Sequence, residues 1–332
     1  MKSSHKLALL ALAMFLIAAM SLTLGKYPIS IRELCGMAFS KIVPIGKFWT
    51  DRVETVFFNV RLPRVALACM VGCCLSVAGA SYQGIFRNPM AAPDVLGAST
   101  GAAFGALLAI LLRLNRMQTT LSAFAFSMLC VTLVLLCGRR SKGNAILGLV
   151  LSGIMIGSLF QAATSFLKTV ADPADQLPAM TYWLMGSLSG ASTKDVSFVF
   201  FPMALGLVPI FLLRWRINIL TMDEDEARSL GVNTRRMRAV IVVCATLVTA
   251  ASVSVSGMIG WVGLVIPHLC RRLVGSDYRV LIPASALAGA VFLLVVDNFS
   301  RCLMTVEIPI GILTAFVGAP FFIWLLLGKE EK

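Results

Sequence analysis

The chain has 332 residues, of which 58% are hydrophobic and only 14% are charged, and its mean hydropathy is +0.87. This composition excludes a soluble globular protein and indicates a protein of the lipid bilayer. The net charge of +13 comes from basic residues scattered at the ends of apolar segments, so we expect no nucleic-acid partner.

Ten apolar segments follow one another along the chain. A membrane-spanning helix needs about 20 mostly apolar residues, because the hydrocarbon core is roughly 30 Å thick and each residue rises about 1.5 Å. Nine segments fit, and a tenth is short and interrupted by Gly260, Gly263 and Pro267, so we expect it to be partly unwound. In chain order the ten cover residues 7–24, 65–84, 95–112, 119–137, 146–167, 196–213, 239–257, 258–270, 280–296 and 308–327. We predict an all-α polytopic membrane protein with about ten spanning helices, forming a single membrane domain over residues 1–332.

The distribution of Lys and Arg sets the orientation in the membrane. With the N terminus inside, 17 of the 29 basic residues fall in inner segments, and seven of the other 12 belong to the single outer segment 26–64. Because Lys and Arg accumulate in cytoplasmic loops, both termini are expected in the cytoplasm and the protein in the cytoplasmic (inner) membrane. We interpret 7–24 as a span and not a signal peptide, since no cleavage site and soluble domain follow it.

A faint internal similarity relates two spans. Residues 61–79 and 235–257 each begin with Arg-x-x-Arg and end in Ser-Val-x-Gly. Five spans separate the two starts, so one begins outside and the other inside, which is typical of the inverted repeats of transporters. Chance similarity between apolar segments is the alternative.

The segment 97–101 matches the Gly-x-Ser-x-Gly pattern of serine hydrolases. That pattern presents a nucleophile only between a strand and a helix, whereas spanning helices are expected on both sides here. A formal triad of Ser99, His268 and Asp297 defines a rival, an intramembrane serine hydrolase. We favour helix packing by small residues, and we predict no catalytic residue, metal or cofactor.

The connection 85–94 carries two prolines that forbid a continuous helix. Pro89 and Pro93 push the preceding residues towards extended conformations, and Asp94 is expected to cap a helix that begins near Val95. This short, rigid, non-helical connection on the cytoplasmic side suits a gate.

A short cytoplasmic helix is predicted at about 222–230. Thr221 and Glu224 have the spacing of a capping box, four acidic residues follow at 223–226, and Gly231 fits the position after the helix. An isolated helix of this length is marginal in water, so we expect it to pack against a partner.

Five motifs in order resemble the FecCD-type permeases of ABC importers, which serve iron–siderophore, haem and cobalamin uptake. They are "RLPR" (61–64), "GASYQGIFRNPMAAPDVLGASTGA" (79–102), "EARSLGVN" (226–233), "GMIGWVGLVIPHLCRRLVGSD" (257–277) and "VEIPIGILTAFVGAPFFIWLL" (306–326). The chain departs from the family's usual pattern at Ala92, where an acidic residue is common, and at Met90, where leucine is commoner.

The resemblance implies partners and site residues. It implies a second permease subunit in a homodimer with spans five and ten lining the path, cytoplasmic ABC ATPase subunits, and an external substrate-binding protein. It assigns ATPase coupling to Asp223, Glu224, Glu226, Ala227, Leu230 and Gly231. It assigns binding-protein docking to Arg61, Arg64 and Arg301, and a cytoplasmic gate to Asn88, Pro89 and Met90 with a second gate loop at 138–146.

We therefore expect a non-enzymatic permease subunit of an ATP-driven importer. The sequence holds no Gly-x-x-x-x-Gly-Lys-Ser/Thr loop, so ATP hydrolysis is expected on a separate ATPase subunit. The substrate is expected to be a ferric siderophore, with haem or cobalamin as the alternatives. A secondary transporter is a further rival, although such proteins usually carry ionisable residues inside their spans.

Overall fold

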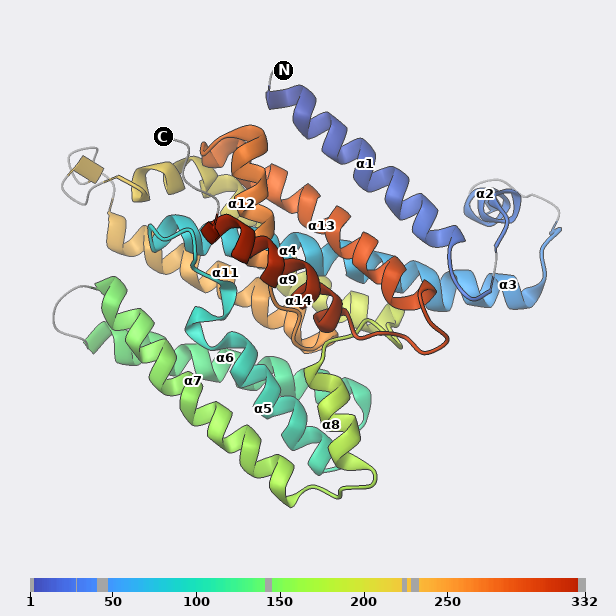
Figure 1. The fold of residues 1–332 in the computed structure, drawn as a ribbon, viewed down its shortest axis with the longest axis horizontal. Helices are drawn as coiled ribbons and strands as arrows, with labels where there is room; N and C mark the ends of the chain where they lie inside the picture. The colour runs from blue at the N-terminus through green and yellow to red at the C-terminus, as the bar shows by residue number, and fades with distance from the viewer. Residues whose placement is uncertain are drawn as a thin grey trace.

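The protein is described by a computed structural model over residues 3–27, 29–40, 47–140, 145–222, 226–227 and 233–327. Within these ranges it is helical and contains no strand, which confirms the predicted all-α fold (Figure 1). The longer helices are α1 (Ser3–Thr23), α4 (Leu62–Ile85), α5 (Ala98–Leu111), α6 (Arg116–Arg140), α7 (Ala145–Val170), α9 (Thr193–Leu220), α11 (Thr234–Ser256), α12 (Val262–Val274), α13 (Tyr278–Cys302) and α14 (Ile310–Leu327). The shorter ones are α2 (Ile31–Ser40), α3 (Asp51–Thr55), the π-helical turn η1 (Val56–Arg61), the 3-10 turn η2 (Pro93–Leu96) and α8 (Gln176–Leu184).

The ten longer helices correspond in order to the ten predicted spans. Among the described residues, seven helices are long and apolar enough to cross a membrane, and α5 and α14 are shorter apolar helices. With 14 residues, α5 reaches only about 21 Å at 1.5 Å per residue, less than the roughly 30 Å of a hydrocarbon core. It begins at Ala98 and not near Val95 because Gly97 has the left-handed φ of 75°, which no helix continues through.

The predicted interruption of the segment 258–270 is confirmed in its first part. Residues 257–260 are not helical, Gly257 has a φ of 66°, and α12 then runs from Val262 through Pro267 to Val274. The chain therefore crosses this region as an irregular stretch followed by a short helix, as in the discontinuous helices of transporters.

Helix α4 lies at the centre of the core and contacts α13, α12, α11 and α9. Glycines allow its backbone to approach two of these neighbours closely. A Cβ at Gly72 would lie 2.3 Å from the carbonyl oxygen of Gly289 in α13, and a Cβ at Gly79 would lie 1.8 Å from the carbonyl oxygen of Gly263 in α12. Without a hydrophobic driving force inside the bilayer, such close packing by small residues stabilises helix association.

The two spans with similar sequences, α4 and α11, pack side by side in opposite directions (Figure 1). A hydrogen bond of 2.7 Å joins Tyr82 Oη of α4 to Thr246 Oγ1 of α11. At the inner end, Lys6 Nζ donates to the carbonyl oxygen of Leu273, which puts the start of α1 beside the end of α12. This arrangement agrees with the predicted cytoplasmic side.

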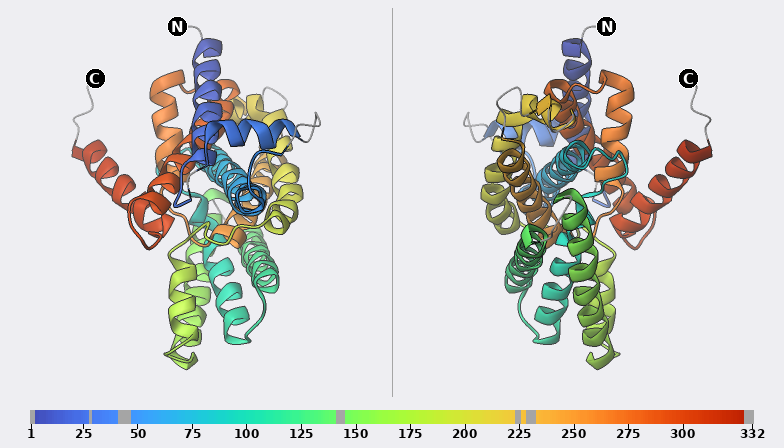
Figure 2. Two further views of the ribbon diagram at one scale, coloured as in Figure 1. Left: turned by 90° about the vertical axis from the view of Figure 1, so that its right-hand side faces the viewer. Right: turned by 90° about the vertical axis from the view of Figure 1, so that its left-hand side faces the viewer.

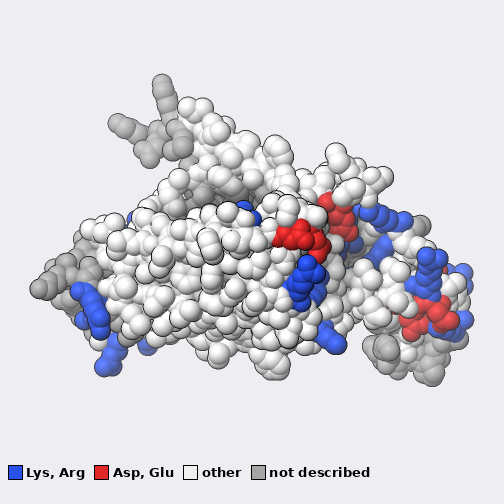
Figure 3. All heavy atoms as spheres, turned by 90° about the horizontal axis from the view of Figure 1, so that it is seen from below, with Lys and Arg blue, Asp and Glu red and all other residues white. Residues whose placement is uncertain are grey.

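In the view of Figure 3, charged side chains lie at both ends of the molecule and in a further group between them, and much of the remaining visible surface is uncharged. The broad uncharged surface fits a protein that lies largely in hydrocarbon. One outer end carries a small lobe of α2 and α3 with its own apolar cluster, formed by Ile29, Met37, Trp49, Val53 and Phe57.

Helix α14 projects from the rest of the chain (Figure 2). It contacts α12 and α13, and several of its large apolar side chains face outward; Phe316, for example, is 74% exposed. This helix, the tenth predicted span, leaves an apolar groove between itself and the body of the protein.

Candidate functional site

The connection between α4 and α5 brings the three predicted gate residues together in one exposed turn. The Asn88 backbone N–H donates to the carbonyl oxygen of Gln83 at 3.2 Å, and the Met90 backbone N–H donates to Asn88 Oδ1 at 2.9 Å. Residues 88–90 are exposed and begin three residues after Ile85, the last residue of α4. An asparagine side chain that binds the backbone two residues on stabilises such a turn, so the loop has a defined shape.

The prediction that Asp94 caps the helix after this loop is wrong. Asp94 lies inside η2, and α5 begins after Gly97 without a side-chain cap. The Asp94 carboxylate instead accepts a hydrogen bond from the Ser99 hydroxyl. The rest of η2 and Gly97 separate Asp94 from the first backbone N–H groups of α5, because Gly97 redirects the chain.

The same contact answers the hydrolase alternative. Ser99 is buried and bonded to Asp94, whereas the formal triad requires it to contact a histidine. Asp297 pairs with two arginines, and no described residue bonds Nε2 of His268. The glycines around Ser99 serve packing, since a Cβ at Gly101 would lie 2.6 Å from the carbonyl oxygen of Phe126 in α6.

Part of the predicted coupling helix lies outside the described residues. Asp223, Glu224, Leu230 and Gly231 belong to that part, as does 141–144 of the second gate loop. Glu226 and Ala227 are described, both are helical, and Ala227 is fully buried. Thr221 does not start a new helix in the described part, because it follows the last residue of α9 and its hydroxyl donates to the Asn218 carbonyl oxygen.

Hydrogen bonds tie the cytoplasmic ends of several helices together. Asn218 of α9 donates from Nδ2 to Asp277 Oδ1 at 2.8 Å and accepts from the Tyr278 backbone N–H at 2.9 Å. Arg271 of α12 donates to Gln83 Oε1 of α4 at 2.6 Å. Burial raises the pKa of Asp277, but hydrogen bonds from the Arg279 backbone N–H and from Asn218 outweigh it, so this pKa lies below its usual value.

The three arginines assigned to docking lie beneath the outer surface, with 4%, 6% and 5% exposure for Arg61, Arg64 and Arg301. Arg61 donates to the carbonyl oxygens of Leu22, Thr23 and Tyr27. Arg301 donates to the carbonyl oxygens of Ser21 and Leu24. Both guanidinium groups therefore cap the C-terminal end of α1, where unpaired carbonyls and the helix dipole favour a cation.

Arg64 and Arg301 also share a buried carboxylate. Arg64 Nε lies 2.9 Å from Asp297 Oδ1, and Arg301 Nε lies 3.4 Å from Asp297 Oδ2. Arg64 Nη1 lies 3.0 Å from Glu307 Oε1 at the partly exposed edge of this cluster. The cluster joins α4 to both ends of the 297–307 segment. Docking of the binding protein at these three arginines stays a prediction.

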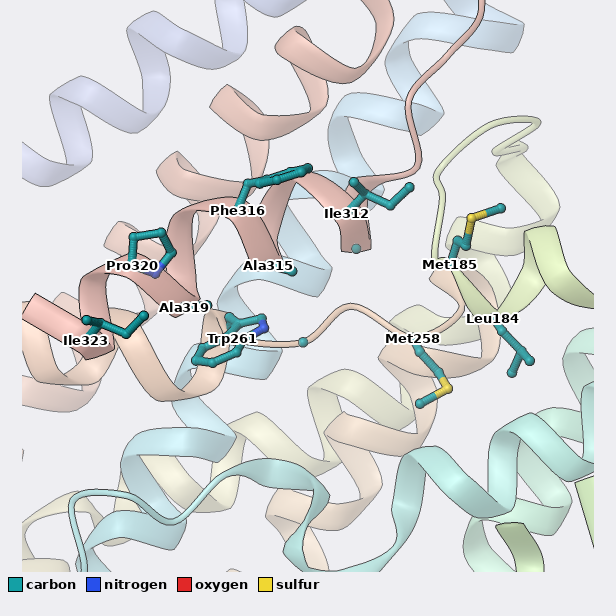
Figure 4. Close-up of a pocket in the computed structure, with 12 residues that line it drawn as sticks. Leu184, Met185, Met258, Trp261, Ile312, Ala315, Phe316, Ala319, Pro320 and Ile323 are labelled. Carbon is teal, nitrogen blue, oxygen red and sulfur yellow. The ribbon is translucent and has the colours of Figure 1, made fainter. Parts of the chain in front are cut away.

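A cavity of about 720 Å³ lies in the groove beside α14 (Figure 4). None of the described residues that line it is charged. Its walls come from α14, from the end of α8 and from the irregular stretch before α12, with Ile312, Ala315, Phe316, Ala319, Met258 and Trp261 among its lining residues. Of the two spans that the resemblance assigns to a path, α14 lines this cavity and α7 does not.

Backbone hydrogen bonds join the three segments that surround the cavity. The Ile310 backbone N–H at the start of α14 donates to the Gly186 carbonyl oxygen at 2.8 Å, and the Ser187 backbone N–H donates to the Ser256 carbonyl oxygen at 2.7 Å. Sequence reasoning missed both α8 and the positive φ of 70° at Trp261. Gly257 and Gly260 could have indicated the irregular stretch before α12. Helix α8 has only nine residues, which is too short for a hydropathy pattern to indicate a span.

Comparison with known proteins gives consistent matches along nearly the whole chain. Residues 10–328 match the model of the FecCD transport family. The chain is 38% identical over 314 residues to the molybdate import system permease protein MolB of Haemophilus influenzae, covering 94% of this chain and 92% of that protein. It is also 38% identical over 319 residues to a "probable iron chelatin transport system permease protein" of Helicobacter pylori, covering 96% of each.

Two further matches extend this set. The chain is 36% identical over 334 residues to the hemin transport system permease protein HmuU of Yersinia pestis, covering 98% of this chain and 96% of that protein. A solved structure described as an inward-facing conformation of a metal-chelate type ABC transporter superposes with a TM-score of 0.87 at 37% identity, covering 97% of this chain and 99% of that one. Sequence and fold therefore agree over the same residues.

Proposed function

The chain belongs to the FecCD transport family of ABC importer permeases, and from that premise we propose that it carries ferric siderophores across the inner membrane. The family and the spanning helices make it a multi-pass membrane permease, a transporter subunit. Its relatives import molybdate, iron chelates or haem. The choice of a ferric siderophore among these cargoes is the proposal.

The observation that carries the proposal is the apolar cavity beside α14. A cavity of about 720 Å³ without a charged lining residue offers room for a bulky chelate and few groups that would hold it tightly. A compact, strongly hydrated oxyanion would instead need hydrogen-bond donors or positive charge in its binding site. This difference favours a chelate over molybdate for this chain.

We further infer that the permease works as a homodimer whose second copy closes the groove. In one chain the groove is open, and Phe316, Ile323 and Trp324 of α14 are 74%, 56% and 58% exposed. A two-fold axis beside α14 would turn two open grooves into one enclosed passage, as closed symmetric oligomers do with self-complementary faces. The helix that projects from the body of the chain supports this arrangement.

ATP is hydrolysed by separate cytoplasmic subunits in this account. The segment 222–230 docks on the ATPase, and its movement switches the gate residues Asn88, Pro89 and Met90 between closed and open arrangements. The external binding protein docks at the opposite end, where Arg61, Arg64 and Arg301 hold the outer ends of α1, α4 and α13 together. The exposed hydrogen-bonded loop 88–90 at the cytoplasmic end of α4 supports the gate assignment.

Uptake in cells that lack this protein tests the cargo. Cells with and without the restored gene are given labelled ferric siderophore, haem, cobalamin or molybdate, and accumulation is measured over minutes. Restored uptake of ferric siderophore alone is expected. Restored uptake of molybdate alone would overturn the cargo assignment while leaving the permease assignment intact.

A further inference from the structure

Arg87 is the second residue after the end of α4 at Ile85, and its backbone is in the left-handed region with a φ of 50°. Among the described residues, Arg87, Arg113 and Trp261 are the only non-glycine residues with positive φ. L-residues with a Cβ seldom adopt this conformation, and it persists where surrounding contacts require it. The contacts made by the Arg87 side chain are therefore expected to hold its backbone in this conformation.

Those contacts are with the end of another helix. Arg87 Nε donates to the carbonyl oxygen of Leu220 at 3.2 Å, and Arg87 Nη2 donates to the carbonyl oxygen of Met222. Leu220 is the last residue of α9, and the final carbonyls of a helix have no partner within the helix. A guanidinium group supplies forked donors and a positive charge at the negative end of the helix dipole.

The place of this contact in the chain is informative. On one side, Arg87 is followed directly by Asn88, Pro89 and Met90, whose turn is fixed to α4 through the Asn88 backbone N–H. On the other side, Met222 is followed by the acidic segment that we assign to ATPase docking. One side chain thus joins the start of the gate loop to the start of the coupling segment.

Both of these contacts are made to backbone atoms, so they depend on where α9 ends and not on which side chain stands at Met222. A shift of the end of α9 therefore displaces two acceptors of the guanidinium group. Because the left-handed backbone at Arg87 leads directly into residues 88–90, a change in this contact alters the position of the gate turn. A second tie between α9 and its neighbours, the Asn218 to Asp277 hydrogen bond, leads away from the gate loop.

We propose that Arg87 is a positioning residue that transmits movement from the C-terminal end of α9 to the gate loop 88–90. This inference rests on the proposed function as an ATP-driven permease. In it, ATPase-driven displacement of the coupling segment moves the Met222 and Leu220 carbonyls, and Arg87 carries the gate turn with them. Loss of the guanidinium group leaves both segments in place but separates their movements.

The first test measures coupling in the reconstituted complex of permease, ATPase and binding protein. Arg87→Gln should lower the substrate transported per ATP hydrolysed by about tenfold, within the range usual for coupling between two sites. Arg113→Gln is the matched control, because Arg113 is also exposed and has a φ of 54° but lies at the outer end of α5. Arg87→Lys, which keeps the charge but not the fork, should fall between the two.

The second test measures the movement directly. Spin labels are placed at Met90 and Met222, which are 45% and 44% exposed, after the exposed Cys35, Cys137 and Cys302 are replaced by serine. The distribution of distances between the labels should stay narrow when ATP replaces ADP in the wild-type complex, and Arg87→Gln should broaden or shift it. Replacing the Met222 side chain leaves its carbonyl oxygen available to Arg87.

Wild-type transport per ATP together with an unchanged distance distribution in Arg87→Gln would overturn the inference. If Arg87→Gln reduced the amount of folded protein, the same two measurements on Arg87→Lys would decide. A wild-type complex without ATP-dependent transport would instead contradict the proposed function. The distance measurement distinguishes the cases, because it reports the link between the segments whether or not cargo moves.

Discussion

The buried cluster around Asp297 gives a sharp prediction about stability. Asp297 has no exposed surface, and its two oxygens lie 2.9 Å from Arg64 Nε and 3.4 Å from Arg301 Nε. Asp297→Asn keeps the shape of the side chain but removes the negative charge between two buried cations. Arg64 retains Glu307 at 3.0 Å, whereas Arg301 loses the one carboxylate that it pairs with among the described residues and keeps the carbonyl oxygens at the end of α1.

Breaking a buried ion pair by removing one partner costs about 3–5 kcal/mol, because the remaining charge stays buried and uncompensated. The asparagine oxygen still accepts a hydrogen bond from Arg64, and Glu307 still neutralises that arginine, so we expect about 3 kcal/mol, at the lower end. Since 1.4 kcal/mol is tenfold in an equilibrium constant, this lowers the folded-to-unfolded ratio by about two powers of ten.

The assay is unfolding of the purified permease in mixed micelles with increasing denaturing detergent, followed by the loss of helical circular dichroism. The matched control is Lys47→Gln, which breaks pairs to Asp51 and Glu54 made by a side chain that is 46% exposed. Exposed pairs contribute about 0–1 kcal/mol, so this control should unfold almost as wild type does. If Asp297→Asn unfolded together with the control, the claim that Asp297 holds the two arginines would be refuted.

Three further predictions concern packing, the cavity and coupling. Gly79→Ala should destabilise the protein by about 3 kcal/mol, the upper end for overpacking, because the added Cβ would lie 1.8 Å from a backbone oxygen of α12. The control is Gly260→Ala, whose Cβ would have no heavy atom within 4 Å, and it should unfold as wild type does. Ala315→Trp should narrow the cavity and reduce uptake of a ferric siderophore with unchanged expression. The control is Leu212→Trp in α9, at a residue that is 71% exposed and away from the cavity, and it should not reduce uptake. Equal uptake by both variants would show that the cavity does not belong to the transport path. Leu230→Asp should leave the permease folded but break the link between ATP hydrolysis and transport, and wild-type coupling in that variant would show that 222–230 is not the ATPase contact.

The spans could be predicted from the sequence because the bilayer imposes one requirement on all of them. Every helix needs a long apolar stretch, and the interrupted segment could be recognised from Gly260, Gly263 and Pro267. The start of α5 was misjudged by three residues, since only the structure gives Gly97 its left-handed backbone. A hydropathy pattern does not show where a single residue changes the direction of the chain.

The outer arginines show what local sequence could not supply. Arg61 meets the carbonyl oxygens of Leu22 and Thr23, which are 39 and 38 residues away in the chain. Arg64 meets Asp297, which is 233 residues away. A motif such as Arg-Leu-Pro-Arg indicates positive charge at the outer end of a span, but the burial of that charge depends on which distant helix ends lie beside it.

The same limit applies to Arg87. Its position next to the gate residues could be read from the sequence, but its contact with the end of α9 depends on two segments 133 residues apart. Sequence patterns for turns and caps involve residues close together in the chain, so they could not predict that Arg87 caps the end of α9. The inner and outer ends of the protein share this device, since arginines from other elements cap the ends of both α9 and α1.

Transport by the purified permease, reconstituted in vesicles with its ATPase and binding protein, tests whether the protein is the transporter subunit of an ATP-driven importer. We expect labelled ferric siderophore to accumulate when ATP is supplied on the ATPase side, and not to accumulate with ADP or without the ATPase. Accumulation driven by an ion gradient in vesicles that hold the permease alone would instead make the protein a secondary transporter.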